Sequence, residues 1–174
     1  MASTNDVQLL LDACEECVRR GSNEAQRWID SWLAQHEMHV WPVLMTAVAD
    51  MQMEYEIKYF LFVCLCRRLR LFGVPTQGAT IRDIVQLVDE QVGEYCNTAQ
   101  PQNPVVKEAI LALALATVKS SSTDTNECIE YITKTLGPSQ LLEYLHGIAE
   151  HVVLASTETK AFIKGILPTC EPSS

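Results

Sequence analysis

The sequence predicts an all-α protein in which about four helical hairpins stack into a right-handed α-solenoid. Three observations lead to this prediction. Apolar residues recur at i, i+3, i+4 and i+7 along most of the chain, which is the period of amphipathic helices. No segment keeps an apolar–polar alternation between turn residues, so no strand is expected. Successive helix pairs begin near residues 5, 39, 79 and 125, about 34, 40 and 46 residues apart, as in helical-repeat proteins.

The first hairpin is predicted from two apolar stripes. One stripe runs from Val7 to Val18 and the next from Ala25 to Leu33. Ser22 directly precedes the second stripe and is a suitable N-cap, because its hydroxyl can accept a hydrogen bond from a free backbone N–H.

The second hairpin begins with a stripe from Val40 to Met51, in which Pro42 is expected to occupy the first turn. Its second helix covers Ile57 to Phe72. Between Tyr59 and Cys66 that helix is apolar on nearly every side, so we expect neighbouring helices to cover it.

The rest of the chain repeats the pattern after a turn at Gly73 to Thr80, with Thr80 as the expected cap of the next helix. Five further stripes follow: Ile81–Tyr95, the alanine-rich Val106–Thr117, Cys128–Leu136, Leu141–Val153 and a short one at Ser156–Ile166. The hairpins therefore cover about residues 5–36, 39–72, 79–119 and 125–154, with a partial fifth at 156–167. Residues 1–4 and 168–174 are expected to be disordered.

Composition narrows the class of partner. The chain has 174 residues, 48% of them hydrophobic, and a net charge of −9. Such an acidic chain is a poor match for nucleic acid or an anionic membrane, and its longest apolar run is too short to cross a bilayer. Seven cysteines at irregular spacing, without a signal-peptide pattern, indicate reduced thiols inside the cell.

All three tryptophans lie within fourteen positions, at Trp28, Trp32 and Trp41. A ligand cage and a seam between helices would both use such a cluster. Trp28 and Trp32 are four residues apart on one apolar face, which favours packing between the first two hairpins. Trp41 lies off the main stripe of its own helix, so it is the best candidate of the three for a surface contact.

The sequence contains two arrangements that resemble metal sites. CEEC at Cys14 to Cys17 has the spacing of a zinc or redox element, but no matching second ligand pair follows. Like Cys64 and Cys66, these thiols are expected in the core. His36 and His39 are expected to be solvated residues of a turn. No metal ligand and no cofactor site is therefore predicted.

The run RRLR, with Arg67, Arg68 and Arg70, is the basic cluster of the chain. At the C-terminal end of a helix these cations interact favourably with the helix dipole, and they could also bind phosphate or carboxylate. No nucleotide-binding, hydrolase or metalloprotease signature is present, so no enzyme is predicted.

Several segments, in order, resemble one family. They are AQRWIDSWLAQ (25–35), HVWPVLMTAV (39–48), EIKYFLFVCLCRRLRL (56–71), the VP pair at 74–75, KEAILALALATV (107–118) and QLLEYLHGIAEHV (140–152). Their order and spacing, over residues 7 to 153, resemble the N-terminal HEAT repeats of nuclear transport receptors of the importin-β superfamily, most clearly the transportin-SR and importin-13-like branch. Because such receptors are several times longer, the resemblance implies either a truncated piece or a divergent short protein.

The resemblance implies a function without catalysis. In that family the N-terminal repeats bind the GTP form of the small GTPase Ran, chiefly through the second helix of each hairpin, and the array carries protein cargo between cytoplasm and nucleus. Carried over, it implies a Ran- or protein-binding surface on the polar faces of those helices: Arg27, Asp30, Glu56, Lys58, Tyr59, Arg67, Arg68, Lys107 and Glu108. Glu56 and Arg68 match the family pattern directly, and the others follow from helical phase.

The partners implied are Ran-GTP, protein cargo of basic character, and nucleoporins. Two alternatives stay open at this point. One is a HEAT-, armadillo- or TPR-type scaffold that binds a peptide or protein and is unrelated to transport. The other is an all-α enzyme or metal protein built on CEEC and the two turn histidines.

Overall fold

The computed structural model describes residues 2–77, 79–96, 103–119, 126, 129–130, 132–134 and 136–151. Its elements are the helices α1 (Thr4–Arg20), α2 (Asn23–Leu33), α3 (Glu37–Ala49), α4 (Tyr55–Phe72), α5 (Ile81–Cys96), α6 (Pro104–Val118) and α8 (Pro138–His151). The described residues contain no strand, which confirms the all-α prediction for them. Most of the helix expected at 128–136, the stripe at 156–166 and the C-terminal tail lie outside these residues.

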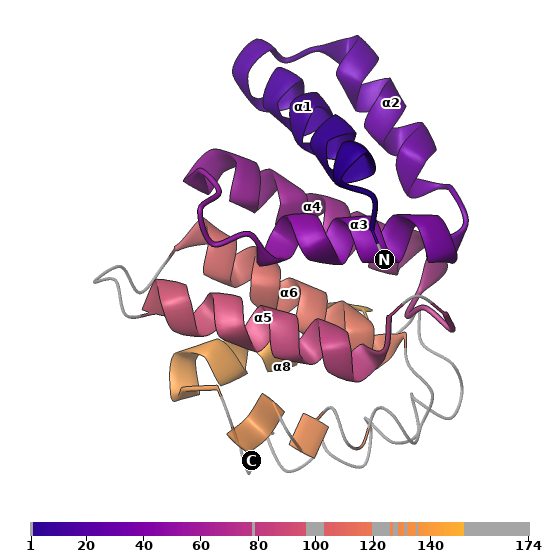
Figure 1. Ribbon diagram of the computed structural model, residues 1–174. Coiled ribbons are helices and arrows are strands. Elements are labelled where there is room, and N and C mark those ends of the chain that lie inside the picture. The colour runs from indigo at the N-terminus through magenta and orange to yellow at the C-terminus, as the bar shows by residue number, and fades with distance from the viewer. Residues whose placement is uncertain are drawn as a thin grey trace, which may run out of the picture.

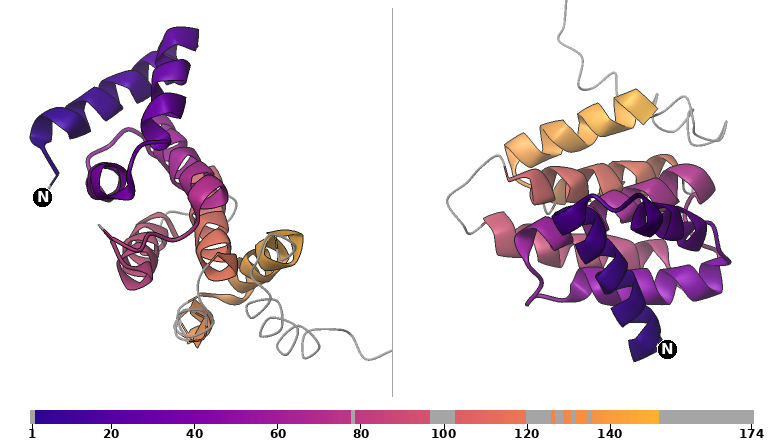
Figure 2. Two further views of the ribbon diagram at one scale, coloured as in Figure 1. Left: turned by 90° about the vertical axis from the view of Figure 1, so that its right-hand side faces the viewer. Right: turned by 90° about the horizontal axis from the view of Figure 1, so that it is seen from above.

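The helices are arranged in two layers. Figure 2, left, shows α1, α3 and α5 on one side and α2, α4, α6 and α8 on the other. In the second layer α4 packs along α6, and α6 packs along α8 (Figure 1). Helix α2 packs chiefly on α1 and reaches α4 near its own C-terminal end.

Local capping explains where several helices begin. The Ser22 hydroxyl accepts a 3.2 Å hydrogen bond from the N–H of Ala25, as predicted. The N–H of Asp83 donates to the Thr80 hydroxyl at 3.1 Å, and the N–H of Thr80 donates back to the Asp83 carboxylate at 2.8 Å. This reciprocal pair confirms Thr80 as the cap of α5. Helix α1 begins at Thr4, so the last residue of the segment expected to be disordered is already helical.

The expected start of α3 was wrong. The helix begins at Glu37, so Pro42 is its sixth residue and not part of the first turn. The earlier start depends on His36, whose Nδ1 accepts a 3.1 Å hydrogen bond from the N–H of Met38. Pro42 removes one donor from the interior of the helix, but its own carbonyl accepts a 2.7 Å hydrogen bond from the Thr46 hydroxyl. His36 and His39 are both exposed, as expected.

The tryptophan cluster is only partly the predicted seam. Trp32 is buried and stacks on Trp28 with ring centroids 6.2 Å apart, while His39 of α3 meets Trp32 edge-on. The expectation that Trp41 is the surface tryptophan was wrong: it is fully buried, whereas Trp28 is 38% exposed. The reason is that α3 packs against α1, α4 and α5, so neighbours cover even the flank of its apolar stripe.

Helices α4 and α6 form the centre of the molecule. Helix α4 is covered by α1, α3 and α6, which accounts for its nearly continuous apolar stretch. In α6 the alanines are buried, and α8 approaches closely at Gly147. A Cβ added to Gly147 would lie 2.8 Å from the Cβ of Ala114, so this contact requires glycine. The small residues of α6 therefore permit the close helix approach that the sequence predicts.

Candidate functional site

Seven of the nine residues proposed from the sequence reach solvent, all on helices of the second layer (Figure 2). We call this set the interaction face: Arg27 and Asp30 of α2, Glu56, Tyr59 and Arg67 of α4, and Lys107 and Glu108 of α6. Asp30 and Glu108 are partly exposed and the other five are exposed. The face combines cations, carboxylates and an aromatic ring.

An ion pair joins two helices of the interaction face. The Arg67 guanidinium of α4 pairs with the Asp30 carboxylate of α2, and both side chains are well over a third exposed. Gln26 supports Asp30 from one turn earlier in α2, through a 2.9 Å hydrogen bond to the same carboxylate oxygen. Because the pair is exposed, it positions the helices more than it stabilises them.

Lys58 does not belong to the polar face, so its predicted placement was wrong. Its side chain is 1% exposed. The ε-amine donates hydrogen bonds to the backbone carbonyls of Val48 at 2.5 Å and Asp50 at 2.6 Å. Burial lowers the pKa of Lys58 to about 8, and the nearby Asp50 carboxylate opposes this shift. The residue therefore satisfies the C-terminal carbonyls of α3 and contributes to stability.

Arg68 was also wrongly placed on the polar face. It is 4% exposed, and its Nη1 donates to the carbonyl oxygens of Leu33 at 2.5 Å and Gln35 at 2.7 Å. Its guanidinium carbon lies 4.3 Å from the centre of the Phe72 ring. Burial lowers the pKa of Arg68, against the opposing effect of Glu37. Of the RRLR run, only Arg67 and Arg70 present their charges to solvent.

Sequence reasoning missed Arg70 as part of the interaction face. Arg70 was treated as part of the RRLR run, with a role at the helix dipole or in binding phosphate or carboxylate, and was not included among the residues of the interaction face. Arg70 lies eleven residues after Tyr59, close to three full turns, so the two share one side of α4 with Val63 and Arg67. Helical phase alone could have found it.

Four cysteines of the described chain are free thiols, and three of them are buried as expected. The Cys14 thiol of α1 hydrogen-bonds with the Cys64 thiol of α4, and this contact and burial raise the pKa of Cys14. Cys66 donates to the carbonyl of Glu108 at 3.4 Å, and burial raises its pKa as well. Cys17 is partly buried rather than enclosed. Raised pKa values make these thiols poor nucleophiles.

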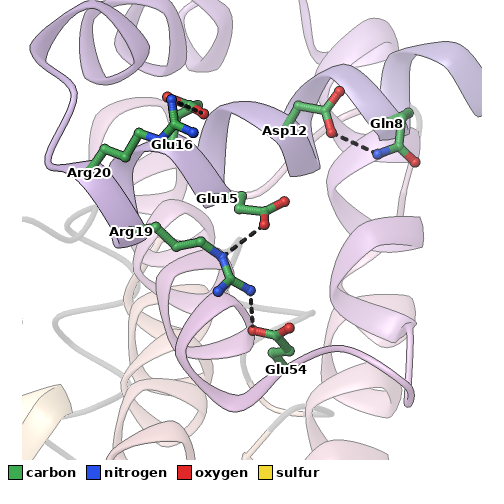
Figure 3. A network of polar contacts seen from close by, with 7 residues as sticks. All are labelled: Gln8, Asp12, Glu15, Glu16, Arg19, Arg20 and Glu54. Atoms are coloured by element: carbon green, nitrogen blue, oxygen red, sulfur yellow. Dashed lines mark hydrogen bonds and ion pairs between the residues drawn. The ribbon is translucent and has the colours of Figure 1, made fainter.

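Helix α1, in the other layer, has a different charge arrangement (Figure 3). Arg19 pairs with Glu15 at 2.8 Å and with Glu54 at 2.7 Å, and Arg20 pairs with Glu16 at 3.6 Å. Both cations of this helix are therefore matched by carboxylates.

No family model, no curated protein and no solved structure matches the chain. Among the described helices, none is long and apolar enough to cross a membrane. In the same residues, no group of three or more histidine, cysteine, aspartate or glutamate side chains is placed to hold a metal ion. The geometry thus defines a class only: an all-helical, two-layered protein with a mixed-charge surface on α2, α4 and α6.

Proposed function

We propose that the chain is a protein-binding helical array of the nuclear transport receptor type, which binds Ran-GTP through the interaction face. The proposal includes a right-handed stack of HEAT-like hairpins, beginning with α1–α2, α3–α4 and α5–α6. Protein cargo would be carried by the same array between cytoplasm and nucleus.

The observation that carries the proposal is the position of the interaction face. It occupies the second helix of each of the first three hairpins, and these helices share one layer (Figure 2). The family resemblance implies partner binding on the same helices. Tyr59 and the arginines are residue types enriched where binding energy concentrates in protein interfaces.

The mechanism would be linkage between two binding events and not chemistry. Ran-GTP and cargo would each change the affinity for the other by the same factor, because coupling free energy is reciprocal. A stack of hairpins that contact mainly their neighbours can transmit such coupling by small changes in curvature.

The test is a titration of the protein with Ran loaded with a non-hydrolysable GTP analogue, alongside Ran-GDP. We expect selective binding of the GTP form, weakened about tenfold by Glu56→Ala and by Arg67→Ala. The matched controls Glu90→Ala and Arg20→Ala lie on the other layer and should change the affinity less than about twofold. Circular dichroism of each variant separates lost binding from lost folding.

Equal binding of both nucleotide forms, or no binding by a folded protein, would contradict the transport proposal. The remaining candidate would then be a helical scaffold that binds another protein through the same face.

A further inference from the structure

Charge is divided unequally between α1, α3 and α5 on one side and α2, α4 and α6 on the other; α8, also in the second layer, adds two glutamates and no lysine or arginine. Helices α1, α3 and α5 contain nine acidic and three basic residues, whereas α2, α4 and α6 contain four acidic and six basic ones. Two of those six, Lys58 and Arg68, are buried. The exposed charges of α2, α4 and α6 therefore balance, although the chain as a whole has a net charge of −9.

The cations of the two layers also differ in their partners. Arg19 and Arg20 of α1 are paired with carboxylates (Figure 3). Arg27, Arg70 and Lys107, on the other layer, form no ion pair with any residue the structure describes. Arg67 uses Nη1 for its ion pair with Asp30. Because a guanidinium has five N–H donors, this pair does not occupy all of them.

Two of these cations, Arg67 and Arg70, lie on the same side of α4 as Tyr59 and Val63. Tyr59, Val63, Arg67 and Arg70 follow one another at helical spacing, and we call them the α4 stripe. Tyr59 is 36% exposed and Val63 is partly exposed. Arg67 and Arg70 are three residues apart, so their Cβ atoms are about 5–6 Å from each other.

Among the described residues, one carboxylate pairs with the stripe: Asp30 binds Nη1 of Arg67, whereas Arg70 has no such partner. Glu56 precedes Arg67 by eleven residues, about 16 Å along the helix. Glu108 of α6 is partly exposed and forms no ion pair with Arg70. Arg70, and the nitrogens of Arg67 other than Nη1, thus have guanidinium donors without a carboxylate partner among the residues that the structure describes.

We infer that the α4 stripe docks an acidic amphipathic helix of a protein partner. Two carboxylates spaced i, i+3 or i, i+4 on that helix meet Arg67 and Arg70, and its apolar side covers Tyr59 and Val63. The acidic layer of α1, α3 and α5 repels the same helix and steers it to this side. The inference rests on the proposed function for the location of the binding face, but its chemistry follows from the charges.

The test is a nuclear magnetic resonance titration of the whole chain with a synthetic helical peptide. The peptide has glutamates spaced i, i+4 on one side and leucines on the other; a second version has lysine at each glutamate. We expect the glutamate peptide, at up to about 1 mM, to shift the Nε–H signals of Arg67 and Arg70 and not those of Arg19 and Arg20. The lysine peptide should leave the signals of Arg67 and Arg70 unchanged.

Two double variants with equal charge loss make the test specific. Arg67→Gln with Arg70→Gln should weaken binding about tenfold, and Arg19→Gln with Arg20→Gln less than about twofold. Tyr59→Ala should also weaken it while leaving the charges in place. No shift at Arg67 and Arg70, or an unchanged affinity of the first double variant, would overturn the inference.

The result of the peptide titration can be told apart from the result of the Ran titration that tests the proposed function. Peptide binding at the stripe without Ran-GTP binding would support the docking chemistry and contradict the transport proposal. Selective Ran-GTP binding without any effect of the peptide would support the transport proposal and contradict the docking inference.

Discussion

The ε-amine of Lys58 lies 2.5 Å from the backbone carbonyl oxygen of Val48, inside the protein. The same amine also binds the carbonyl of Asp50, so one side chain of α4 closes the C-terminal end of α3. The last carbonyls of a helix have no partner within it, and a buried end needs one from elsewhere.

Replacing Lys58 with Met should therefore lower the free energy of unfolding by about 1–3 kcal/mol, because one buried and one partly buried carbonyl lose their donor. Urea denaturation of the purified protein measures this change. Lys107→Met removes an exposed lysine and should stay within about 0.5 kcal/mol of the parent protein. Equal effects of the two substitutions would show that the buried contact does not matter.

The stability contribution of Lys58 should depend on pH in a defined direction. Burial lowers its folded-state pKa to about 8, below the ordinary lysine value of 10.5. Between these values the unfolded chain binds a proton that the folded chain has released, so the free energy of unfolding rises with pH. The difference in unfolding free energy between the parent and Lys58→Met should rise across that interval. A constant difference would contradict the shift.

Arg68 should tolerate no replacement, including lysine. Its Nη1 binds the carbonyls of Leu33 and Gln35 while its planar guanidinium packs over the Phe72 ring, and a lysine ammonium has no planar group for that packing. Arg68→Lys and Arg68→Met should each lower the unfolding free energy by about 2–3 kcal/mol. Arg70→Met is the control, since Arg70 is exposed, and thermal unfolding compares the three.

Two glycines should respond to alanine in opposite directions. Gly147→Ala places a Cβ 2.8 Å from that of Ala114, so α8 must move away from α6 and stability should fall by about 1–3 kcal/mol. Gly93 lies in α5 with nothing within 4 Å of an added Cβ, and Gly93→Ala should raise stability by about 0.5–1 kcal/mol. Ala114→Gly should partly restore Gly147→Ala, and a failure to do so would contradict the proposed clash.

The buried thiols should resist alkylation. Burial raises the pKa of Cys66, and the contact with Cys64 together with burial raises that of Cys14, so little thiolate forms at neutral pH. In iodoacetamide labelling followed by peptide mass mapping, Cys14, Cys64 and Cys66 should react only after denaturation. Cys17 should react earlier, because it is partly exposed. Rapid labelling of Cys66 in the folded protein would contradict its burial.

Local sequence patterns predicted the features that depend on residues close together in the chain, namely the helices and some of their starts. Apolar spacing predicted the helices, and the hydroxyls of Ser22 and Thr80 predicted two of their starts. The start of α3 was missed because a histidine acts as its cap, which is not among the usual capping residues. Apart from Glu56, which matches the family pattern, the members of the interaction face were predicted from helical phase, and the same reasoning could have added Arg70.

Burial of the charged residues could not be predicted in the same way. Arg68 meets the carbonyl of Leu33, a residue 35 positions earlier, and Lys58 meets the end of the preceding helix. Helical phase assigns a polar face to each helix separately, but it does not tell which helix ends the folded chain brings against that face.

By itself, the sequence determined the all-helical class, the apolar side of each helix and the caps at Ser22 and Thr80, because these depend on residues within a few positions of one another. The tertiary structure alone decided that Trp41 is enclosed while Trp28 reaches solvent. It also decided that two of the cations on α4, Lys58 and Arg68, are buried and that the other two, Arg67 and Arg70, reach solvent. The physical reason is that desolvation and hydrogen bonding depend on all the surroundings of a side chain, and distant segments supply most of them.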